Sequence, residues 1–194
     1  MAQVVTLQDV KAEARRAYGA LWDRAKSLSR DVKLYCHWTA GHWWQLFDDY
    51  HICIDADGTV YQMKNFDVIT ASTYMRNSGS VSIALCCAYG AQSENDLGPY
   101  PPTEKQLNAL AQVICVLADA LDLTIDIQRV MTHAEAAANR DGLYLHDNYG
   151  PRSGDPDTRW DLWVCHEGEV PWSGGDTIRG NANFYRAQGL LNDF

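Results

Sequence analysis

Two of the six histidines directly follow apolar runs in segments that are far apart in the sequence. His37 ends the run VKLYCH, and His133 ends the run RVMTH. Each run is typical of a buried strand, and the end of a strand is where binding and catalytic residues are usually placed. The later segment SGDPDTR adds two carboxylates, Asp155 and Asp157. Two imidazoles and one carboxylate would form a three-ligand zinc site with a fourth position for water, an arrangement that activates hydrolysis.

The strands that must position these side chains are marked by their residue types. Besides the two histidine-bearing runs, YHICIDADGTVYQM at 50–63 predicts a hairpin, because Asp57-Gly58 between two strand-prone runs favours a tight turn. The segment VSIALCCAY at 81–89 is apolar almost throughout, which is typical of a central strand buried on both faces. The sheet is therefore expected to place its most apolar strands at its centre.

Helical patterns occur before, between and after these strands. Thr6 precedes apolar residues at helical spacing, and Thr103 with Gln106 three positions later has the pattern of a capping box. The tail GGDTIRGNANFYRAQGLL at 174–191 predicts a closing helix, whereas the Gly, Asp, Asn and Pro residues of 139–158 predict a long functional loop. This order predicts an α/β fold: a central mixed β-sheet flanked by helices, with the zinc site at one edge of a substrate groove.

Composition narrows the class of protein. The 194 residues suffice for one domain with a substantial core, and 46% hydrophobic and 21% charged residues are a globular composition. A net charge of −9 argues against nucleic acid as a partner, because duplex binders need clustered Lys and Arg. The start has no secretory pattern and no stretch is apolar enough to span a membrane, so we expect synthesis in the cytoplasm. The six cysteines lack CxxC spacing and are expected to be reduced and buried.

Five motifs give the chain a resemblance to a known family, the type 2 N-acetylmuramoyl-L-alanine amidases, from about residue 32 to residue 163. They are HWTAG (37–41), YHICIDADGTVYQ (50–62), RNSGSVSIAL (76–85), THAEAA (132–137) and SGDP (153–156). The family is zinc-dependent and includes phage endolysins, bacterial muropeptide amidases and peptidoglycan recognition proteins. The resemblance implies a single amidase domain over 1–194 with a closing segment at 164–194, whose GGDTIRGNANFYR looks most like prophage endolysins.

The resemblance also implies the ligands of a Zn²⁺ ion. The family histidine that opens H-x-[TS]-A corresponds to His37, and the histidine of the later H-x-[ED] segment corresponds to His133. The third ligand is a Cys or Asp followed by proline, which matches Asp155. Asp157 is the alternative third ligand, because its distance to the following Trp-Asp pair fits the shorter spacing of some relatives.

Three residues are candidates for the catalytic steps. The resemblance implies a catalytic role for Tyr50, which corresponds to the tyrosine of Y-H-x-x-I that is catalytic in phage members. A phenol can donate a hydrogen bond to a developing oxyanion. Glu135 is a secondary candidate for a general base, and its alternative role is to cap the start of a helix. Many active members carry Lys or His two residues before the third ligand, where this chain has Ser153; some active relatives have a small hydroxyl residue there.

Large side chains near the first histidine are candidates for substrate binding. Trp38, Trp43 and Trp44 form an unusually dense group, whose alternative role is a local hydrophobic cluster. Aromatic walls suit the apolar faces and polar edges of glycans and peptides. His51 is expected to be a structural or groove residue on the opposite face of its strand from Tyr50.

The expected function is zinc-dependent hydrolysis of the amide bond between the lactyl group of N-acetylmuramic acid and L-alanine in peptidoglycan. The alternative is a peptidoglycan-binding module that keeps the fold and lacks turnover. Non-catalytic members of the family typically lack the third zinc ligand, so the acidic candidates in this chain favour the enzyme. The protein is expected to be a monomer that acts on the bacterial cell wall after release through a holin, host lysis or a dedicated secretion system.

Overall fold

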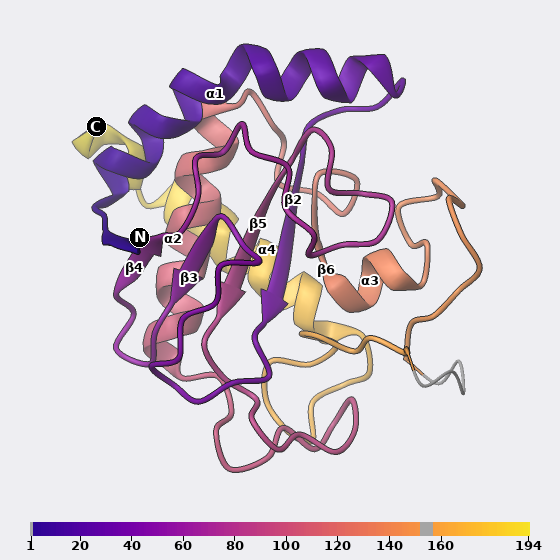
Figure 1. Ribbon diagram of the computed structural model, residues 1–194. Helices are drawn as coiled ribbons and strands as arrows, with labels where there is room; N and C mark the ends of the chain where they lie inside the picture. The colour runs from indigo at the N-terminus through magenta and orange to yellow at the C-terminus, as the bar shows by residue number, and fades with distance from the viewer. Residues whose placement is uncertain (1, 152–156) are drawn as a thin grey trace.

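The computed structural model describes residues 2–151 and 157–194, and its centre is a six-stranded sheet surrounded by helices (Figure 1). In chain order the elements are β1 (Gln3–Val4), α1 (Leu7–Ser27), β2 (Lys33–Trp38), β3 (Ile52–Ile54), β4 (Val60–Gln62), β5 (Ser80–Leu85), α2 (Glu104–Ala120), β6 (Val130–Thr132), α3 (His133–Ala137), α4 (Ser173–Ala187) and the short 3₁₀ helix η1 (Leu190–Asp193). A mixed sheet flanked by helices was the predicted fold class, and it is confirmed.

The strands lie in the order β1-β4-β3-β5-β2-β6. β3, β5, β2 and β6 run parallel to one another, whereas β4 pairs antiparallel with both β3 and β1. Every residue of β2 and β5 is buried, as expected for central strands covered on both faces. The predicted hairpin is β3 and β4, and Gly58 supplies the positive φ of +82° that its turn requires.

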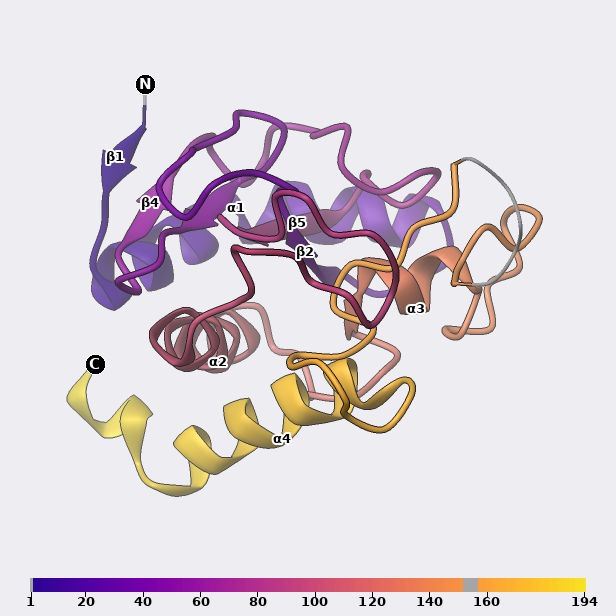
Figure 2. The same ribbon diagram turned by 90° about the horizontal axis from the view of Figure 1, so that it is seen from below.

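The three long helices cover the sheet from two directions. α2 and α4 pack against each other on one face, and loops between the early strands cover the other face (Figure 2). α1 crosses the end of the sheet at which β2 begins (Figure 1). Capping boxes at Thr6 and Thr103 begin α1 and α2, which confirms both predicted helix starts.

Two further expectations concern what the described residues do not form. All six cysteines are buried and unpaired, as predicted. Within residues 2–151 and 157–194, no helix has both the length and the apolar character that a bilayer span requires.

Candidate active site

The sheet brings the two histidines together because their strands are neighbours. β2 and β6 run parallel, and Cys36 pairs with Thr132. His37 follows Cys36 within β2, and His133 follows Thr132 directly after β6, so both histidines lie at the same end of the sheet. The sequence twice contains an apolar run followed by a histidine. The structure explains this pattern, because the two runs are adjacent parallel strands that bring the two histidines together.

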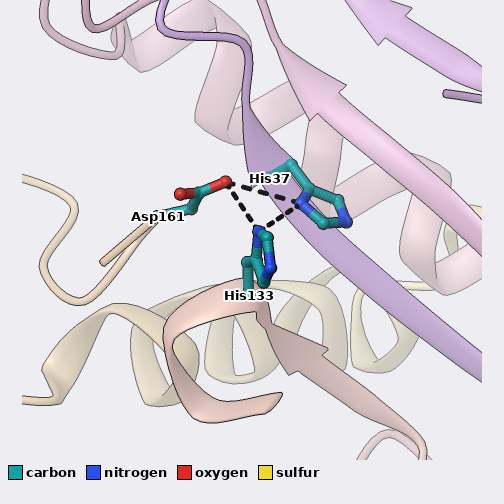
Figure 3. A group of neighbouring side chains, drawn as sticks. All are labelled: His37, His133 and Asp161. Atoms are coloured by element: carbon teal, nitrogen blue, oxygen red, sulfur yellow. Dashed lines mark hydrogen bonds and ion pairs between the residues drawn. The ribbon is translucent and has the colours of Figure 1, made fainter. Parts of the chain in front are cut away.

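A third side chain, Asp161, completes a buried cluster with the two histidines (Figure 3). The Nδ1 atoms of His37 and His133 are 3.1 Å apart. Oδ2 of Asp161 lies 3.4 Å from Nδ1 of His37 and 3.2 Å from Nδ1 of His133. The backbone carbonyl of Asp161 accepts a hydrogen bond from the amide of Ala134, which ties the aspartate to the first turn of α3.

The cluster has the donor set and the spacing of a zinc site. Ligand atoms about 2.0–2.1 Å from a tetrahedral zinc ion lie roughly 3.3 Å from one another, close to the three separations between the Nδ1, Nδ1 and Oδ2 atoms. A cation bound between them would satisfy all three buried ligand atoms at once. Two imidazoles and one carboxylate are also the ligands of a catalytic site that keeps one position open.

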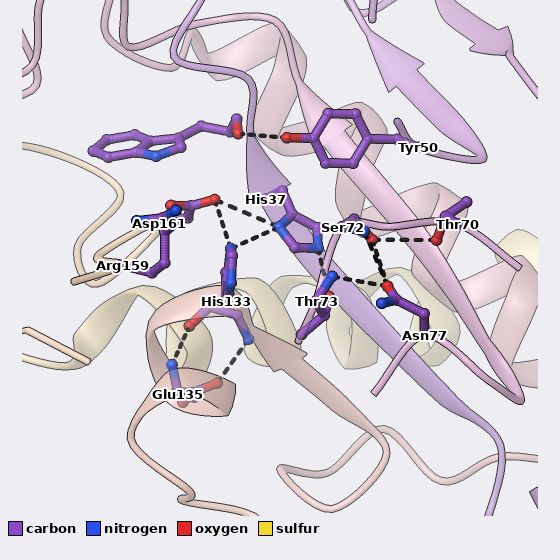
Figure 4. Close-up of polar contacts among 12 residues, drawn as sticks. His37, Tyr50, Thr70, Ser72, Thr73, Asn77, His133, Glu135, Arg159 and Asp161 are labelled. Atoms are coloured by element: carbon purple, nitrogen blue, oxygen red, sulfur yellow. Dashed lines mark hydrogen bonds and ion pairs between the residues drawn. The ribbon is translucent and has the colours of Figure 1, made fainter. Parts of the chain in front are cut away.

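Thr73 fixes the orientation of the first histidine (Figure 4). Its hydroxyl oxygen lies 3.1 Å from Nε2 of His37, and its backbone amide donates to Oδ1 of Asn77 at 2.8 Å. When Nε2–H donates to this hydroxyl, Nδ1 of His37 is left with a free lone pair that faces the cluster. Such a contact behind a metal-binding histidine sets both its tautomer and its ring orientation.

The electrostatics of the cluster favour neutral imidazole beside carboxylate. Burial lowers the pKa of His37 to about 4, although the contact with Asp161 opposes the shift. Burial alone would raise the pKa of Asp161, but the two histidines outweigh that effect and hold it below its usual range. Deprotonated nitrogens and an ionised carboxylate are the forms that bind a metal.

Two cavities meet at this cluster. The first has a volume of about 480 Å³ and is lined by Tyr50 and Asp161 among others; the second has a volume of about 830 Å³ and includes Tyr149. Both are lined by His133 and Arg159. The long loop predicted at 139–158 forms part of the second cavity, through Leu145, His146, Asp147, Tyr149 and Asp157. The two cavities therefore adjoin at His133, beside the cluster.

Tyr50 lines the first cavity beside the cluster. Its ring centroid is 5.2 Å from that of His37, and its hydroxyl lies 3.4 Å from the carbonyl oxygen of Trp38. Burial, and next the charge of Asp161, raise the pKa of the Tyr50 phenol. The phenol thus stays protonated and remains a hydrogen-bond donor near neutral pH.

Glu135 is buried beneath the cluster. Its carboxylate accepts two hydrogen bonds from the guanidinium of Arg179, at 2.8 and 2.9 Å, and one from the backbone amide of Thr132 at 3.0 Å. Thr132 in turn caps α3, so the predicted capping role of Glu135 is present as a capping box. Glu135 lines neither of the two cavities.

The residues proposed to bind substrate lie in different surroundings. Trp38 is buried and lines the first cavity. Trp43 is half-buried and donates to the carbonyl of Pro101, whereas 62% of Trp44 is exposed. His51 is fully buried: the backbone amide of Ser82 donates to its Nδ1, and its Nε2 is 2.8 Å from the carbonyl oxygen of Val68.

Two of the predicted site residues, Asp155 and Ser153, lie outside the described residues. Asp157 is described and exposed; it lines the second cavity but does not belong to the buried cluster. The cluster aspartate, Asp161, was absent from the sequence prediction. A signal was available in RWDLW, where an acidic residue stands among large apolar side chains, a pattern that indicates a buried and therefore paired carboxylate.

Arg159, two residues before Asp161, was also absent from the prediction. Its backbone amide donates to the carbonyl of Tyr149, and its guanidinium donates to the carbonyl of Asp157 at 2.5 Å. The side chain is exposed and lines both cavities. It therefore places a permanent positive charge beside the cluster.

Comparison with known proteins supplies the family context. The family profile described as Amidase_2, N-acetylmuramoyl-L-alanine amidase, matches residues 8–150. This range contains His37, Tyr50 and His133 and ends before Asp161. A search of curated proteins finds no match.

Several solved structures are similar to this chain. The endolysin N-acetylmuramoyl-L-alanine amidase LysCS from Clostridium intestinale URNW is 15% identical, with 55% of this chain and 70% of that chain covered and a TM-score of 0.42. The Ph2119 endolysin from the Thermus scotoductus MAT2119 bacteriophage Ph2119 is 20% identical, with 55% and 73% covered and a TM-score of 0.43. Drosophila PGRP-LB is 17% identical, with 66% and 83% covered and a TM-score of 0.42.

Proposed function

The chain belongs to the N-acetylmuramoyl-L-alanine amidase family, and on that premise we propose that it is a zinc-dependent hydrolase of the lactyl–L-alanine amide bond in peptidoglycan. The observation that carries this proposal is the triangle of two Nδ1 atoms and one carboxylate oxygen with edges of 3.1, 3.2 and 3.4 Å at the meeting point of two cavities. We propose His37, His133 and Asp161 as the zinc ligands. Zinc held by these residues would supply Lewis-acid chemistry, which activates water and polarises the amide carbonyl.

Two side chains are suited to stabilise the charge that develops on the carbonyl oxygen. Tyr50 is a protonated phenol in the wall of the first cavity, and its hydroxyl can turn from the Trp38 carbonyl to the reacting oxygen. Arg159 stands two residues before Asp161, where the family resemblance expects a Lys or His. Its guanidinium remains charged and can stabilise an anion, but it cannot exchange a proton at neutral pH.

The leaving amine needs a proton, and the candidates differ in how free they are to supply it. Glu135 is bound by Arg179 and by backbone amides, so we assign it a structural role. Tyr50 and solvent water remain the proposed donors, since both reach the first cavity. Ser153 remains a prediction from the sequence.

The second candidate function is a peptidoglycan-binding module without turnover. Non-catalytic members of the family typically lack the third ligand, whereas this chain has a buried acidic candidate, Asp161, within reach of both histidines. The enzyme is therefore favoured, and we propose that it acts at the bacterial cell wall as an endolysin-like bacteriolytic hydrolase.

The test is a digest of purified peptidoglycan by the zinc-loaded protein, with the products identified by mass spectrometry. Amidase activity requires free lactyl carboxyl groups and new L-alanine amino termini in equal amounts, and the His37→Ala variant should produce neither. New reducing ends would instead identify a glycosidase and overturn the proposal. Retention of the protein on peptidoglycan without any product would establish the binding module.

A further inference from the structure

Five aromatic rings form a continuous group beside the first cavity. His42 stacks on Tyr89 with 4.2 Å between ring centroids and meets the edge of Tyr100 at 4.6 Å. Trp43 contacts Tyr100 at 5.2 Å and Trp44 at 6.0 Å, both with nearly perpendicular planes. These residues come from two loops that are far apart in the sequence, and we call them the aromatic platform.

The platform has a buried layer and an exposed layer. Trp43 and Tyr100 are half-buried, and the Trp43 indole donates a hydrogen bond to the carbonyl of Pro101. His42 is exposed, as are 62% of Trp44 and 50% of Tyr89. The half-buried rings account for packing against the core. The exposed rings keep much of their surface in water. Contiguous exposed apolar surface of this kind is available for contact with a ligand.

None of the five rings lines the first cavity, but the backbone of both platform loops forms part of its wall. Ala40 and Ala88 line the first cavity. Ala40 is two residues before His42, and Ala88 directly precedes Tyr89. A β-bridge joins Gly41 to Ala88, and the amide of Tyr89 donates to the carbonyl of Gly41. Ala40 and Ala88 both adopt positive φ, at 52° and 67°, a rare conformation for residues other than glycine that is often found at ligand-binding positions.

We propose that the aromatic platform binds the glycan strand of peptidoglycan, so that the strand lies at the end of the first cavity lined by Ala88, Gly90 and Ala91. This proposal rests on the proposed function, since it assigns the two sides of the scissile bond. A pyranose ring presents C–H groups on its faces and hydroxyl groups at its edges. The negative face of an aromatic ring attracts such C–H groups while the hydroxyl edge remains in water.

The lining of the second cavity suits the other part of the substrate. It includes Asn77, His146 and Asp147 as well as Arg159, so it offers hydrogen-bond partners and charges of both signs, as the first cavity does through Asp49, Asp161 and Arg159. A stem peptide carries amide, amine and carboxylate groups that need such partners, whereas a glycan strand is uncharged along its sugar rings. With the glycan strand on the platform, the stem peptide is assigned to the second cavity, and the scissile amide to the cluster.

Binding of a sugar chain can be measured separately from hydrolysis. The probes are a tetramer of N-acetylglucosamine and glycan strands stripped of their stem peptides, titrated calorimetrically with chelator present so that turnover is absent. A Trp44→Ala/Tyr89→Ala double variant should bind each probe at least about tenfold more weakly, as expected for the loss of two exposed aromatic contacts. Tyr144→Ala is the matched control, because it removes an aromatic ring that is 80% exposed and does not belong to the platform.

A second readout links the platform to the direction of the substrate. On intact peptidoglycan, the double variant should raise KM more than it lowers kcat, and the rise should be smaller on a soluble muramyl dipeptide that lacks a glycan strand. Equal glycan affinity in wild type and double variant would overturn the proposal even if the protein is an active amidase. Platform-dependent glycan binding by a protein that hydrolyses nothing would instead support the platform and refute only the proposed activity. Circular dichroism and thermal melting confirm that both variants are folded.

Discussion

The guanidinium of Arg179 and the carboxylate of Glu135 form a buried ion pair with two hydrogen bonds, which attaches α4 to the histidine-bearing end of the sheet. Arg179 also donates to the carbonyl of Val130, at the start of β6. The pair lies behind the cluster, so it supports the site without contacting the cavities.

Arg179→Ala should lower the free energy of unfolding by about 3–5 kcal/mol, because it leaves the carboxylate of Glu135 buried without its partner. Urea denaturation at pH 7 measures this loss. Lys105→Ala is the matched control: it removes the partner of Asp57 from a pair that is more than half exposed, and should change the free energy of unfolding little. A similar small effect in both variants would refute the supporting role of Arg179.

Replacement of Asp161 by Asn should strongly reduce zinc affinity, because the amide keeps the shape of the side chain and removes the charge that the metal needs. Metal content after dialysis and competition with a chromophoric chelator measure the effect. Asp155→Asn and Asp157→Asn are tested in parallel and should retain zinc. Loss of zinc in either of these two variants, with retention in Asp161→Asn, would assign the third ligand to the loop instead. In the wild type, chelation should stop hydrolysis and added zinc should restore it.

Thr73→Val removes the hydroxyl that faces Nε2 of His37 and keeps the volume of the side chain. We expect zinc affinity to fall about 10–100-fold, the usual effect of losing such a contact behind a metal-binding histidine. Thr73→Ser should retain the affinity, because it keeps the hydroxyl. Thr70→Val is a further control, since Thr70 is also buried and its hydroxyl contacts Ser72 and Ser82. An unchanged affinity in Thr73→Val would show that packing alone orients His37.

Tyr50→Phe separates a site that holds zinc from one that uses it. Loss of one preorganised oxyanion donor typically lowers kcat about 10²–10³-fold, with a smaller effect if the metal stabilises most of the charge. Zinc content and thermal stability should remain at wild-type values. Tyr61→Phe removes a phenol that bonds to Asp55 outside the cavities and should leave kcat unchanged. A Tyr50→Phe enzyme with wild-type kcat would show that the tyrosine only packs.

The stability of the protein should fall in acid through His51. Burial lowers the pKa of His51 to about 4, from an ordinary value near 6.5, and the amide of Ser82 already donates to the nitrogen that would take the proton. Below about pH 6.5, His51 therefore becomes protonated in the unfolded chain, whereas in the folded chain it stays neutral down to about pH 4. Stability that is complete above pH 6.5 is lost progressively over this window, by up to about 3 kcal/mol.

Urea denaturation of the metal-free protein at several pH values between 7 and 4 measures this dependence. The His51→Gln variant stays neutral throughout, so its stability should decline less steeply over the same range. The contribution of His37 is equal in the two proteins and cancels in the comparison. Parallel profiles for wild type and variant would contradict the assignment to His51.

Local patterns were sufficient to predict much of the fold. Thr6 and Thr103 mark helix starts through contacts within three residues, and Asp57-Gly58 marks a turn through its own backbone preference. His37 was recognisable because the apolar run before it is a strand buried on both faces. Each of these signals arises from neighbours in the chain, so it can be read without knowledge of the tertiary structure.

The missed contacts depend on pairings that no local pattern contains. The carbonyl of Asp161 accepts a hydrogen bond from the amide of Ala134, and this contact joins a loop without a periodic pattern to the first turn of α3. Arg179 appears in the sequence as an ordinary residue of an amphipathic helix, but it is buried against Glu135. The residue types of Asp161 and Arg179 indicate that each can form an ion pair. Which partners they have depends on how α3 and α4 pack.

The first turn of α4 lies so close to the segment after Asp161 and to Glu135 of α3 that only glycine fits at two of its positions. At Gly174 an added Cβ would lie 2.0 Å from the carbonyl oxygen of Leu162, and at Gly175 it would lie 2.3 Å from the carboxylate of Glu135. The amide of Gly174 donates to the carbonyl of Trp163. The start of α4 thus helps to hold Asp161 in place.

This arrangement has a consequence for how the protein is made. The ribosome delivers His37 first, then His133, then Asp161, and α4, which braces Asp161, only after that. At about 5–20 residues per second, the proposed ligand set therefore stays incomplete for seconds after His37 has been made. On the proposed assignment of ligands, a ribosome-bound fragment that stops before α4 should bind zinc more weakly than residues 1–194 do.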